Sequence, residues 1–252
     1  MTKSQDLLER RKKAVTFTEV GELLVENCKK ILLQYEALIE QAREYQDPLS
    51  TPFKIGAIPT IAPYIMAEFV SRVRLSQPDI KLYIRENTTS GLLNELKDGK
   101  IDLALIAFPY DTEDLQYQIA YREKLYLVHS GKQKPFKDDH FDFNALPDGS
   151  LLLLDDGHCL RDHALSGCKL KSDKQIHTFG ANSLQMLVQM VDAELGMTFV
   201  PEMALKAGIL ERTGTRSVLL PVGSFYRDIG FAWRKDNYRQ EKLVELTGCL
   251  TQ

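Results

Sequence analysis

The sequence predicts an α/β protein in which two similar halves face each other across a cleft, preceded by a long helix. Three observations lead to this prediction. Apolar residues recur at helical spacing over residues 20–42. From residue 53 onward, short apolar strands alternate with helical segments, which is typical of parallel sheets with helices on both faces. The strands number about nine, too many for one compact sheet in a chain of this length.

Length and composition narrow the class of protein. The 252 residues allow one large domain or two small ones. With 32 basic and 35 acidic side chains, the net charge of −3 excludes a whole-chain basic nucleic-acid binder. We expect no signal peptide and no membrane span, because the first 13 residues are polar and no apolar run reaches about 18 residues. Four cysteines are too few for a secreted disulfide scaffold, so we expect a reducing cytoplasm.

The N-terminal segment is basic. Its first 13 residues carry five basic and two acidic side chains, including the cluster Arg10-Arg11-Lys12-Lys13. Residues 14–18 then alternate between apolar and polar, which predicts one strand of a small hairpin beside a basic turn. The alternative is a solvated tail.

A long helix follows. Either a capping box from Thr16 to Glu19 or an N-cap at Thr18 would begin it, and Pro48 would end it. About 27 helical residues span roughly 40 Å, which is awkward to bury on a small domain. We therefore expect the apolar stripe to pack against another chain, the alternative being its own domain. The stripe comprises Val20, Leu23, Leu24, Cys28, Ile31, Leu32, Tyr35, Leu38, Ile39 and Ala42.

The α/β region has a regular order of elements. In such folds, ligands bind in the crevice at the carboxyl ends of the strands. The pattern predicts strands at 53–58, 80–85, 101–107, 124–128, 151–154, 176–179, 197–200 and 229–233, and helices at 63–75, 91–97, 183–195, from 201, and at 238–249.

The segment Asp155-Asp156-Gly157-His158-Cys159-Leu160-Arg161-Asp162 is the most specific local feature, because it follows a predicted strand and precedes a second cysteine, Cys168. Nine positions span about 30 Å when extended and about 14 Å as a helix, whereas a disulfide needs Cα atoms about 4.4–6.8 Å apart. A loop that separates the two cysteines in one state and joins them in another would be a redox switch.

This chemistry needs a thiolate, which nearby His158 and Arg161 would favour, while Asp156 or Asp162 would orient a base. Two alternatives stay open. One is a pair of unrelated buried cysteines. The other is a zinc site formed by His158, Cys159, His163 and Cys168, although no CxxC pair is present.

Other classes of function find little support in the sequence. It contains no GxGxxG, GxxxxGK[ST], HExxH or GxSxG motif. Cys28, Cys249 and Trp233 are interpreted as structural residues.

Three segments resemble LysR-type transcriptional regulators. Residues 18–22 (TEVGE) resemble the start of that family's linker helix, and residues 54–60 (KIGAIPT) resemble the first strand of its effector domain. The GHCLRD segment with Cys168 is similar to the hydrogen-peroxide-sensing OxyR branch. The resemblance extends from about residue 7 to the C-terminus, and GHCLRD is its most specific part.

The resemblance implies roles for individual residues. Cys159 matches the peroxidatic cysteine, Cys168 the resolving cysteine and His158 the histidine beside the reactive thiol. Asp162 matches a loop acid that stabilises the reduced form. Three further matches are Thr60 and Thr89 as peroxide-binding threonines, with Thr88 as the fallback for Thr89, and Arg227 as support for the thiolate. The alternatives are helix caps for the threonines and a surface ion pair for Arg227.

The resemblance also implies an architecture of two periplasmic-binding-protein-like (type 2), Rossmann-like subdomains. Residues 1–17 would be the remnant of a winged helix-turn-helix, and 18–46 the linker and dimerisation helix. Subdomain I would comprise 51–122 plus 229–252, and subdomain II, with the redox loop, 123–228. Effector domains of this family pair into dimers, and four chains typically form a tetramer.

The implied function is non-enzymatic: a regulatory domain that detects hydrogen peroxide through a Cys159–Cys168 disulfide and controls oxidative-stress genes. The implied partners are hydrogen peroxide, further copies of the chain, RNA polymerase and a thiol reductant such as glutaredoxin, with no cofactor, metal or membrane. Because no recognition helix precedes residue 7, we expect this chain alone not to bind DNA specifically. The alternatives are an effector domain for a small organic inducer and a thiol peroxidase.

Overall fold

The computed structural model describes residues 6–11, 14–46, 51–112, 115–132, 141–220 and 225–250. The chain divides into two compact units, Met1–Pro52 and Phe53–Gln252, each of which is described by itself. No helix in the described ranges is both long and apolar enough to cross a membrane.

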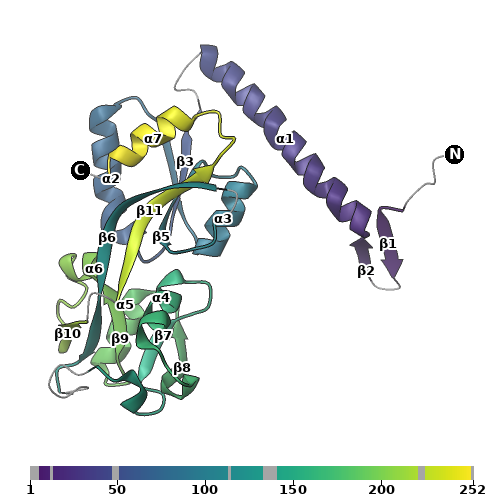
Figure 1. The fold of residues 1–252 in the computed structure, drawn as a ribbon. Helices are drawn as coiled ribbons and strands as arrows, with labels where there is room; N and C mark the ends of the chain where they lie inside the picture. The colour runs from purple at the N-terminus through teal and green to yellow at the C-terminus, as the bar shows by residue number, and fades with distance from the viewer. Residues whose placement is uncertain are drawn as a thin grey trace. The chain divides into compact units, whose positions relative to one another are not determined.

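The N-terminal unit consists of a hairpin and one long helix (Figure 1). Strands β1 (Leu8–Arg11) and β2 (Ala14–Phe17) pair antiparallel, and α1 (Glu19–Gln46) follows, so the predicted hairpin and helix are confirmed. The capping box is wrong, because Thr16 lies in β2 opposite Glu9. Thr18 caps the helix instead, since its Oγ1 accepts a 3.1 Å hydrogen bond from the Gly21 amide. Lys12 and Lys13 of the basic cluster lie outside the described residues.

The apolar stripe of α1 is exposed. It has no partner among the described residues of its own unit, because β1 and β2 pack only near the helix start. The exposed large side chains of the stripe are Leu23, Leu24, Ile31, Leu32, Tyr35, Leu38 and Ile39.

The second unit is built around a mixed seven-stranded sheet with the order β10-β6-β11-β5-β3-β4, in which β9 also pairs with β6. Within this sheet only β3, β4 and β5 pair parallel, so the prediction of parallel sheets is wrong for most of it. The remaining pairs are antiparallel because two long strands, β6 and β11, run through both halves of the unit (Figure 1). The strands of this sheet are β3 (Phe53–Ala57), β4 (Leu82–Glu86), β5 (Leu103–Phe108), β6 (Leu115–Ser130), β9 (Thr198–Pro201), β10 (Thr215–Leu219) and β11 (Tyr226–Arg234).

The antiparallel pairing of β11 with β6 shifts its register by a bulge between Ile229 and Gly230. A side chain at Gly230 would bring its Cβ within 2.4 Å of the Gln118 carbonyl oxygen, so the close approach of the two strands requires glycine.

Helices cover the sheet and a separate parallel pair, β7 (Leu151–Leu154) and β8 (Ile176–Ala181). The helices expected at 63–75, 91–97, 183–195, from 201 and at 238–249 are confirmed. Sequence reasoning did not predict β10 as a strand, and it left the conformation of residues 159–168 open. The helices of this unit are α2 (Ala62–Ser76), α3 (Thr89–Lys97), α4 (Cys159–Cys168), α5 (Leu184–Asp192), α6 (Glu202–Lys206) and α7 (Gln240–Gly248), with short 3₁₀ turns at Phe143–Ala145 and Asp173–Gln175.

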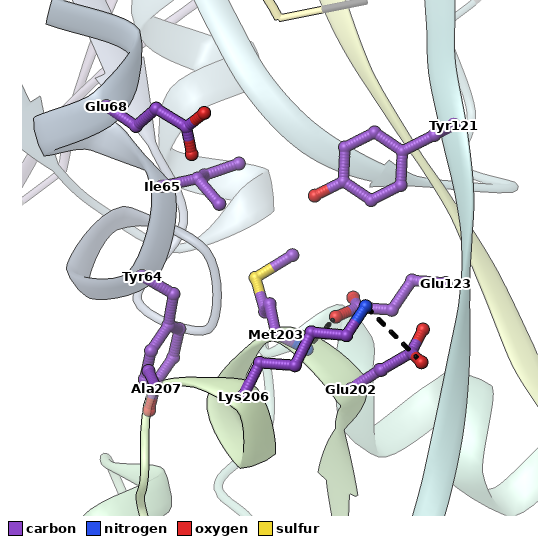
Figure 2. Close-up of a pocket in the computed structure, with 9 residues that line it drawn as sticks. All are labelled: Tyr64, Ile65, Glu68, Tyr121, Glu123, Glu202, Met203, Lys206 and Ala207. Carbon is purple, nitrogen blue, oxygen red and sulfur yellow. Dashed lines mark hydrogen bonds and ion pairs between the residues drawn. The ribbon is translucent and has the colours of Figure 1, made fainter. Parts of the chain in front are cut away.

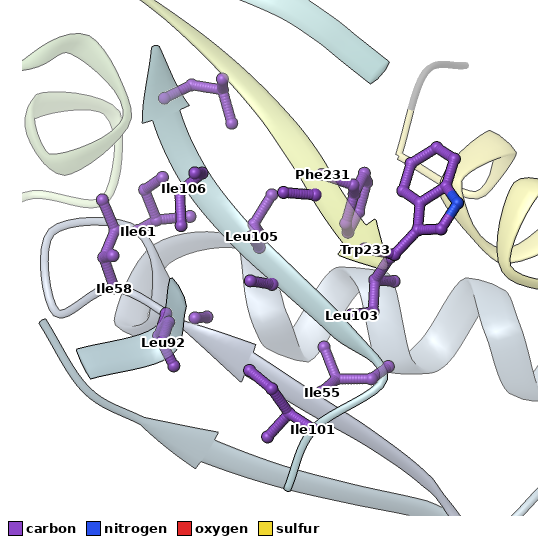
Figure 3. Close-up of a cluster of buried hydrophobic side chains, with 14 of the residues drawn as sticks. Ile55, Ile58, Ile61, Leu92, Ile101, Leu103, Leu105, Ile106, Phe231 and Trp233 are labelled. Atoms are coloured by element: carbon purple, nitrogen blue, oxygen red, sulfur yellow. The ribbon is translucent and has the colours of Figure 1, made fainter. Parts of the chain in front are cut away.

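The unit contains two hydrophobic cores. The first lies between the parallel strands, α2, α3 and α7, where Ile55, Leu105 and Phe231 are fully buried (Figure 3). The second packs β7, β9 and α5 around Leu152, Phe199 and Val188. The predicted subdomain boundaries at 122/123 and 228/229 stay a prediction.

Candidate functional site

Cys159 is placed by the turn that follows β7. Gly157 in this turn has a φ of +91°, a left-handed conformation that favours glycine. His158 is the N-cap residue of α4, and Cys159 is the first residue of the helix, with 2% of its surface exposed. The thiol therefore lies at a helix N-terminus, where the helix dipole favours a negative charge.

A second helix N-terminus lies next to the same thiol. Thr89 begins α3, is 1% exposed and favours the thiolate form of Cys159 through its side chain, as the Ala107 backbone does. The Thr89 hydroxyl has no conventional hydrogen-bond partner in the described structure. Thr88, the fallback candidate, is the actual cap of α3, because its Oγ1 accepts a 3.2 Å hydrogen bond from the Gly91 amide.

Arg227 is fully buried on β11, which excludes the surface ion pair considered for it. Its Nη1 donates a 2.8 Å hydrogen bond to Thr60 Oγ1, and its Nη2 donates a 3.1 Å bond to the Thr60 carbonyl. Thr60 therefore serves this guanidinium and caps no helix, since α2 has Ile61 at its N-cap. Arg227 and Thr89 thus act directly on Cys159, and Thr60 is connected to this site through its hydrogen bonds with Arg227.

Glu123 completes the network, and sequence reasoning missed it. Its Oε2 accepts a 2.8 Å hydrogen bond from Arg227 Nε, and its Oε1 accepts a 2.7 Å bond from the Met203 amide. The pair is a buried salt bridge, with both side chains almost fully inaccessible. The available signal was an acidic residue directly before the apolar run 124–128, where a charge requires a buried partner.

The electrostatic balance at Cys159 favours the neutral thiol. Burial raises the pKa of Cys159 above its ordinary value, although the Arg227 charge and the Thr89 side chain act in the opposite direction. The Asp162 carboxylate, exposed in the first turn of α4, also raises the pKa of Cys159. Asp162 acts similarly on Tyr110, whose pKa is raised by burial and by this charge. The resting site therefore holds a protonated thiol beside groups that favour its ionisation.

His158 is buried beside Cys159 and makes no side-chain capping bond. Arg161 points elsewhere, because its Nη1 donates to the Leu154 carbonyl and its Nε pairs with Asp156 at 3.0 Å. These two contacts close the turn before α4. The structure therefore gives Arg161 and Asp156 a role in the turn rather than at the thiol.

Cys168 is the last residue of α4, at the opposite end of the helix from Cys159. It is a free thiol packed in the second core, whereas Cys159 packs in the first. Burial raises the pKa of Cys168 to about 12. Nine helical steps separate the two Cα atoms by about 14 Å, far beyond disulfide range. A Cys159–Cys168 bond therefore requires α4 to unwind.

The zinc alternative gains no support from this arrangement. Among the described residues, no group of three or more His, Cys, Asp or Glu side chains is placed to hold a metal ion. His163 lies one turn after Cys159 and is buried, with Nδ1 unpartnered within the described structure. Burial and, as the second cause, the Arg227 charge lower the pKa of His163 to about 4, so its ring is neutral near pH 7.

A cavity of about 370 Å³ opens beside Glu123 (Figure 2). It lies between α2, β6 and α6, and neither Cys159 nor Thr89 lines it. Burial raises the pKa of Tyr121 to about 12, and the neighbouring Glu123 carboxylate contributes to this shift. Its lining residues are Tyr64, Ile65, Glu68, Tyr121, Glu123, Glu202, Met203, Lys206 and Ala207.

Comparison with known proteins defines the class. The family model described as "LysR substrate binding domain" matches residues 46–252. The chain is 35% identical over 205 residues to the HTH-type transcriptional regulator EstR of Acinetobacter baylyi, covering 81% of this chain and 68% of the relative. The chain belongs to the LysR family of transcriptional regulators, and the predicted α/β fold of two periplasmic-binding-protein-like halves is confirmed.

Within this family, the chain resembles the OxyR branch. It is 35% identical to the hydrogen peroxide-inducible genes activator of Haemophilus influenzae, covering 79% of this chain and 66% of the relative. The reduced form of the regulatory domain of OxyR2 from Vibrio vulnificus superposes with a TM-score of 0.75 at 34% identity, over 81% of this chain and 95% of that one. The chain thus spans about two thirds of the length of these two curated relatives.

Proposed function

We propose that this chain is the redox-sensing regulatory part of a LysR-type activator, and that Cys159 and Cys168 detect hydrogen peroxide by forming a disulfide. One observation carries the proposal. A single helix, α4, holds the two cysteines at opposite ends and in different cores, and the first cysteine faces buried Arg227 and the unpartnered Thr89 hydroxyl. The activity named for the OxyR relatives supports the same function.

The chemistry has two steps. The Cys159 thiolate attacks one oxygen of hydrogen peroxide, the O–O bond breaks, and the products are a sulfenic acid and hydroxide. The Cys168 sulfur then attacks the Cys159 sulfur, the S–OH bond breaks, and a disulfide and water are formed. Peroxide gains two electrons and the cysteine pair loses two.

The neighbouring side chains have separate roles in the first step. Arg227 and Thr89 favour the thiolate. We assign hydrogen-bonding of the peroxide to the Thr60 and Thr89 hydroxyls, of which Thr60 is held by Arg227. His158 lies at the helix N-cap beside the thiol and lines the same turn. Asp162 disfavours the thiolate and thus stabilises the reduced state.

The output of the sensor is proposed to be a change in α4. Since α4 links the two cores, its unwinding repacks both and biases how copies of the chain assemble. We assign self-association to the exposed stripe of α1. Specific operator binding is assigned to a helix-turn-helix, which is not among the elements of the described ranges. We further propose that the activator contacts RNA polymerase and that a thiol reductant such as glutaredoxin reduces the disulfide. The proposed location is the cytoplasm.

The test is peptide mass mapping after a brief low-micromolar peroxide pulse, with unreacted thiols alkylated. The expected result is a selective Cys159–Cys168 disulfide, with Cys28 and Cys249 still free. Slow and equal reaction of all four thiols would refute the proposal.

A further inference from the structure

Glu123 is the one buried carboxylate that hydrogen-bonds the guanidinium beside the reactive thiol, within the described residues. We propose that Glu123 is a positioning residue for the reaction of Cys159: it fixes Arg227 against Thr60 and moderates the positive charge that Arg227 presents to the thiol. The inference rests on the proposed function only in treating Cys159 as the reacting group.

More hydrogen bonds hold the Arg227–Glu123 pair than are needed to fix its orientation. Arg227 donates from Nε to Glu123 on β6 and from Nη1 and Nη2 to Thr60 in the turn between β3 and α2, so two separate segments hold the guanidinium plane. Glu123 is itself held by the Met203 amide of α6 at 2.7 Å. A charge-assisted hydrogen bond of this length in a buried site restricts the guanidinium to one orientation.

Through its charge, Glu123 influences how readily the Cys159 thiol ionises. Arg227 is the charged group that most favours the Cys159 thiolate, and Glu123 is its ion-pair partner at 2.8 Å. In a buried site, a charge acts over several ångströms with little screening. The carboxylate therefore cancels part of the potential that Arg227 creates at the thiol.

Other polar and titratable groups around Cys159 and Glu123 also affect the ionisation of these two side chains. Around Cys159 they are Arg227 on β11, Asp162 on α4, Thr89 on α3 and Tyr110 after β5, while His163 on α4 faces Arg227. Around Glu123 they are Arg227, Tyr64 on α2, Tyr121 on β6 and the Met203 amide on α6. Arg227 is thus the cation shared by both sets.

Glu202 supplies a matched control. It lines the same cavity as Glu123, as Figure 2 shows, but pairs with Lys206 at 3.5 Å rather than with Arg227. Glu202→Gln removes the same charge as Glu123→Gln from the same cavity without breaking the Arg227 pair.

The experiment uses the full chain with Cys28, Cys168 and Cys249 replaced by serine, which leaves Cys159 as the sole thiol. The ultraviolet absorbance of its thiolate is titrated against pH, with a cysteine-free chain as the blank. In Glu123→Gln, we expect the titration midpoint at lower pH and a thiolate fraction near neutral pH about three to ten times higher. Glu202→Gln should follow the parent. An unchanged or higher midpoint in Glu123→Gln, or equal shifts in both variants, would overturn the proposal.

Glu123→Asp covers the case in which the glutamine variant does not fold. The aspartate keeps the charge but is one methylene shorter, so it cannot reach both Arg227 and the Met203 amide. The expected result is a midpoint close to that of the parent and a several-fold slower formation of sulfenic acid with peroxide. A parent-like rate would contradict the positioning role.

The titration contains no peroxide, so its result does not depend on the proposed function. If Cys159 proves unreactive toward peroxide in the unmodified chain, the proposed function fails while the effect of Glu123 on the thiol can still be measured.

Discussion

Cys159 and Cys168 begin and end the same ten-residue helix, and each packs in a different hydrophobic core. The helix is therefore both the spacer that keeps the two thiols apart and the structure that their bond would destroy. In the structure both thiols are free, as a reduced sensor requires.

Cys168→Ser should stop the reaction at its first step. Cys159 keeps Arg227, Thr60 and Thr89, and Cys168 packs in the other core, so Cys159 should still form a sulfenic acid at a rate close to the original. Sulfenic-acid-specific labelling after a peroxide pulse measures this product. If Cys159 does not react in this variant, the division into peroxidatic and resolving cysteines is wrong.

Arg227→Gln should destabilise the protein and slow the peroxide reaction. Removing one partner of a buried ion pair leaves the other charge uncompensated and typically costs about 3–5 kcal/mol. Denaturant unfolding measures this loss in the free energy of unfolding. Arg122→Gln is the control, because the Arg122 guanidinium is exposed to solvent and its pair with Asp228 should contribute far less to stability. Equal losses in the two variants would contradict the assigned burial of Arg227.

Acid should weaken the fold through His163. Its pKa is about 4 in the folded state and near 6.5 when unfolded, so the unfolded chain binds the additional proton. The contribution of the neutral His163 ring to the free energy of unfolding is fully present above pH 6.5 and is lost as the pH falls through 4. This loss amounts to about 3 kcal/mol in total. Unfolding curves between these pH values measure the slope, which should decrease in His163→Gln. An unchanged slope would mean that other groups carry the acid sensitivity.

Charges on the α1 stripe should weaken self-association. Leu32 and Ile39 are exposed in the structure, and Leu32→Glu with Ile39→Glu would place two carboxylates in a face that we assign to a second copy of the chain. Analytical ultracentrifugation should show a shift toward monomer. Lys29→Glu, also on α1 but outside the stripe, is the control, and an unchanged sedimentation profile of the double variant would place the interface elsewhere.

Cys159→Ser separates the three functional hypotheses. A peroxide sensor loses its response, whereas an effector domain for a small organic inducer keeps it. A thiol peroxidase would be recognised in the unmodified chain by sustained consumption of peroxide in the presence of a reductant. Stoichiometric consumption, one peroxide per Cys159, is expected of the sensor.

Periodicity and turn residues predicted most elements, because helical and strand spacing are local properties of the sequence. The continuity of β6 from Leu115 to Ser130 could not be predicted, since most of its first half is exposed or half-buried and lacks an apolar run. The site residues Thr60, Thr89 and Arg227 came from the family resemblance rather than from spacing. Glu123 was missed because its partner lies 104 positions away, and only the fold brings the two charges together.

The two-core packing of α4 also determines how readily such a sensor is reset. Whatever free energy the chain loses when α4 unwinds is subtracted from the stability of the disulfide. For a two-electron couple, about 1.4 kcal/mol corresponds to about 30 mV of reduction potential. A helix anchored at Cys159 in one core and at Cys168 in the other therefore makes the oxidised state the strained one, so a thiol reductant returns the chain to its resting form once peroxide is gone.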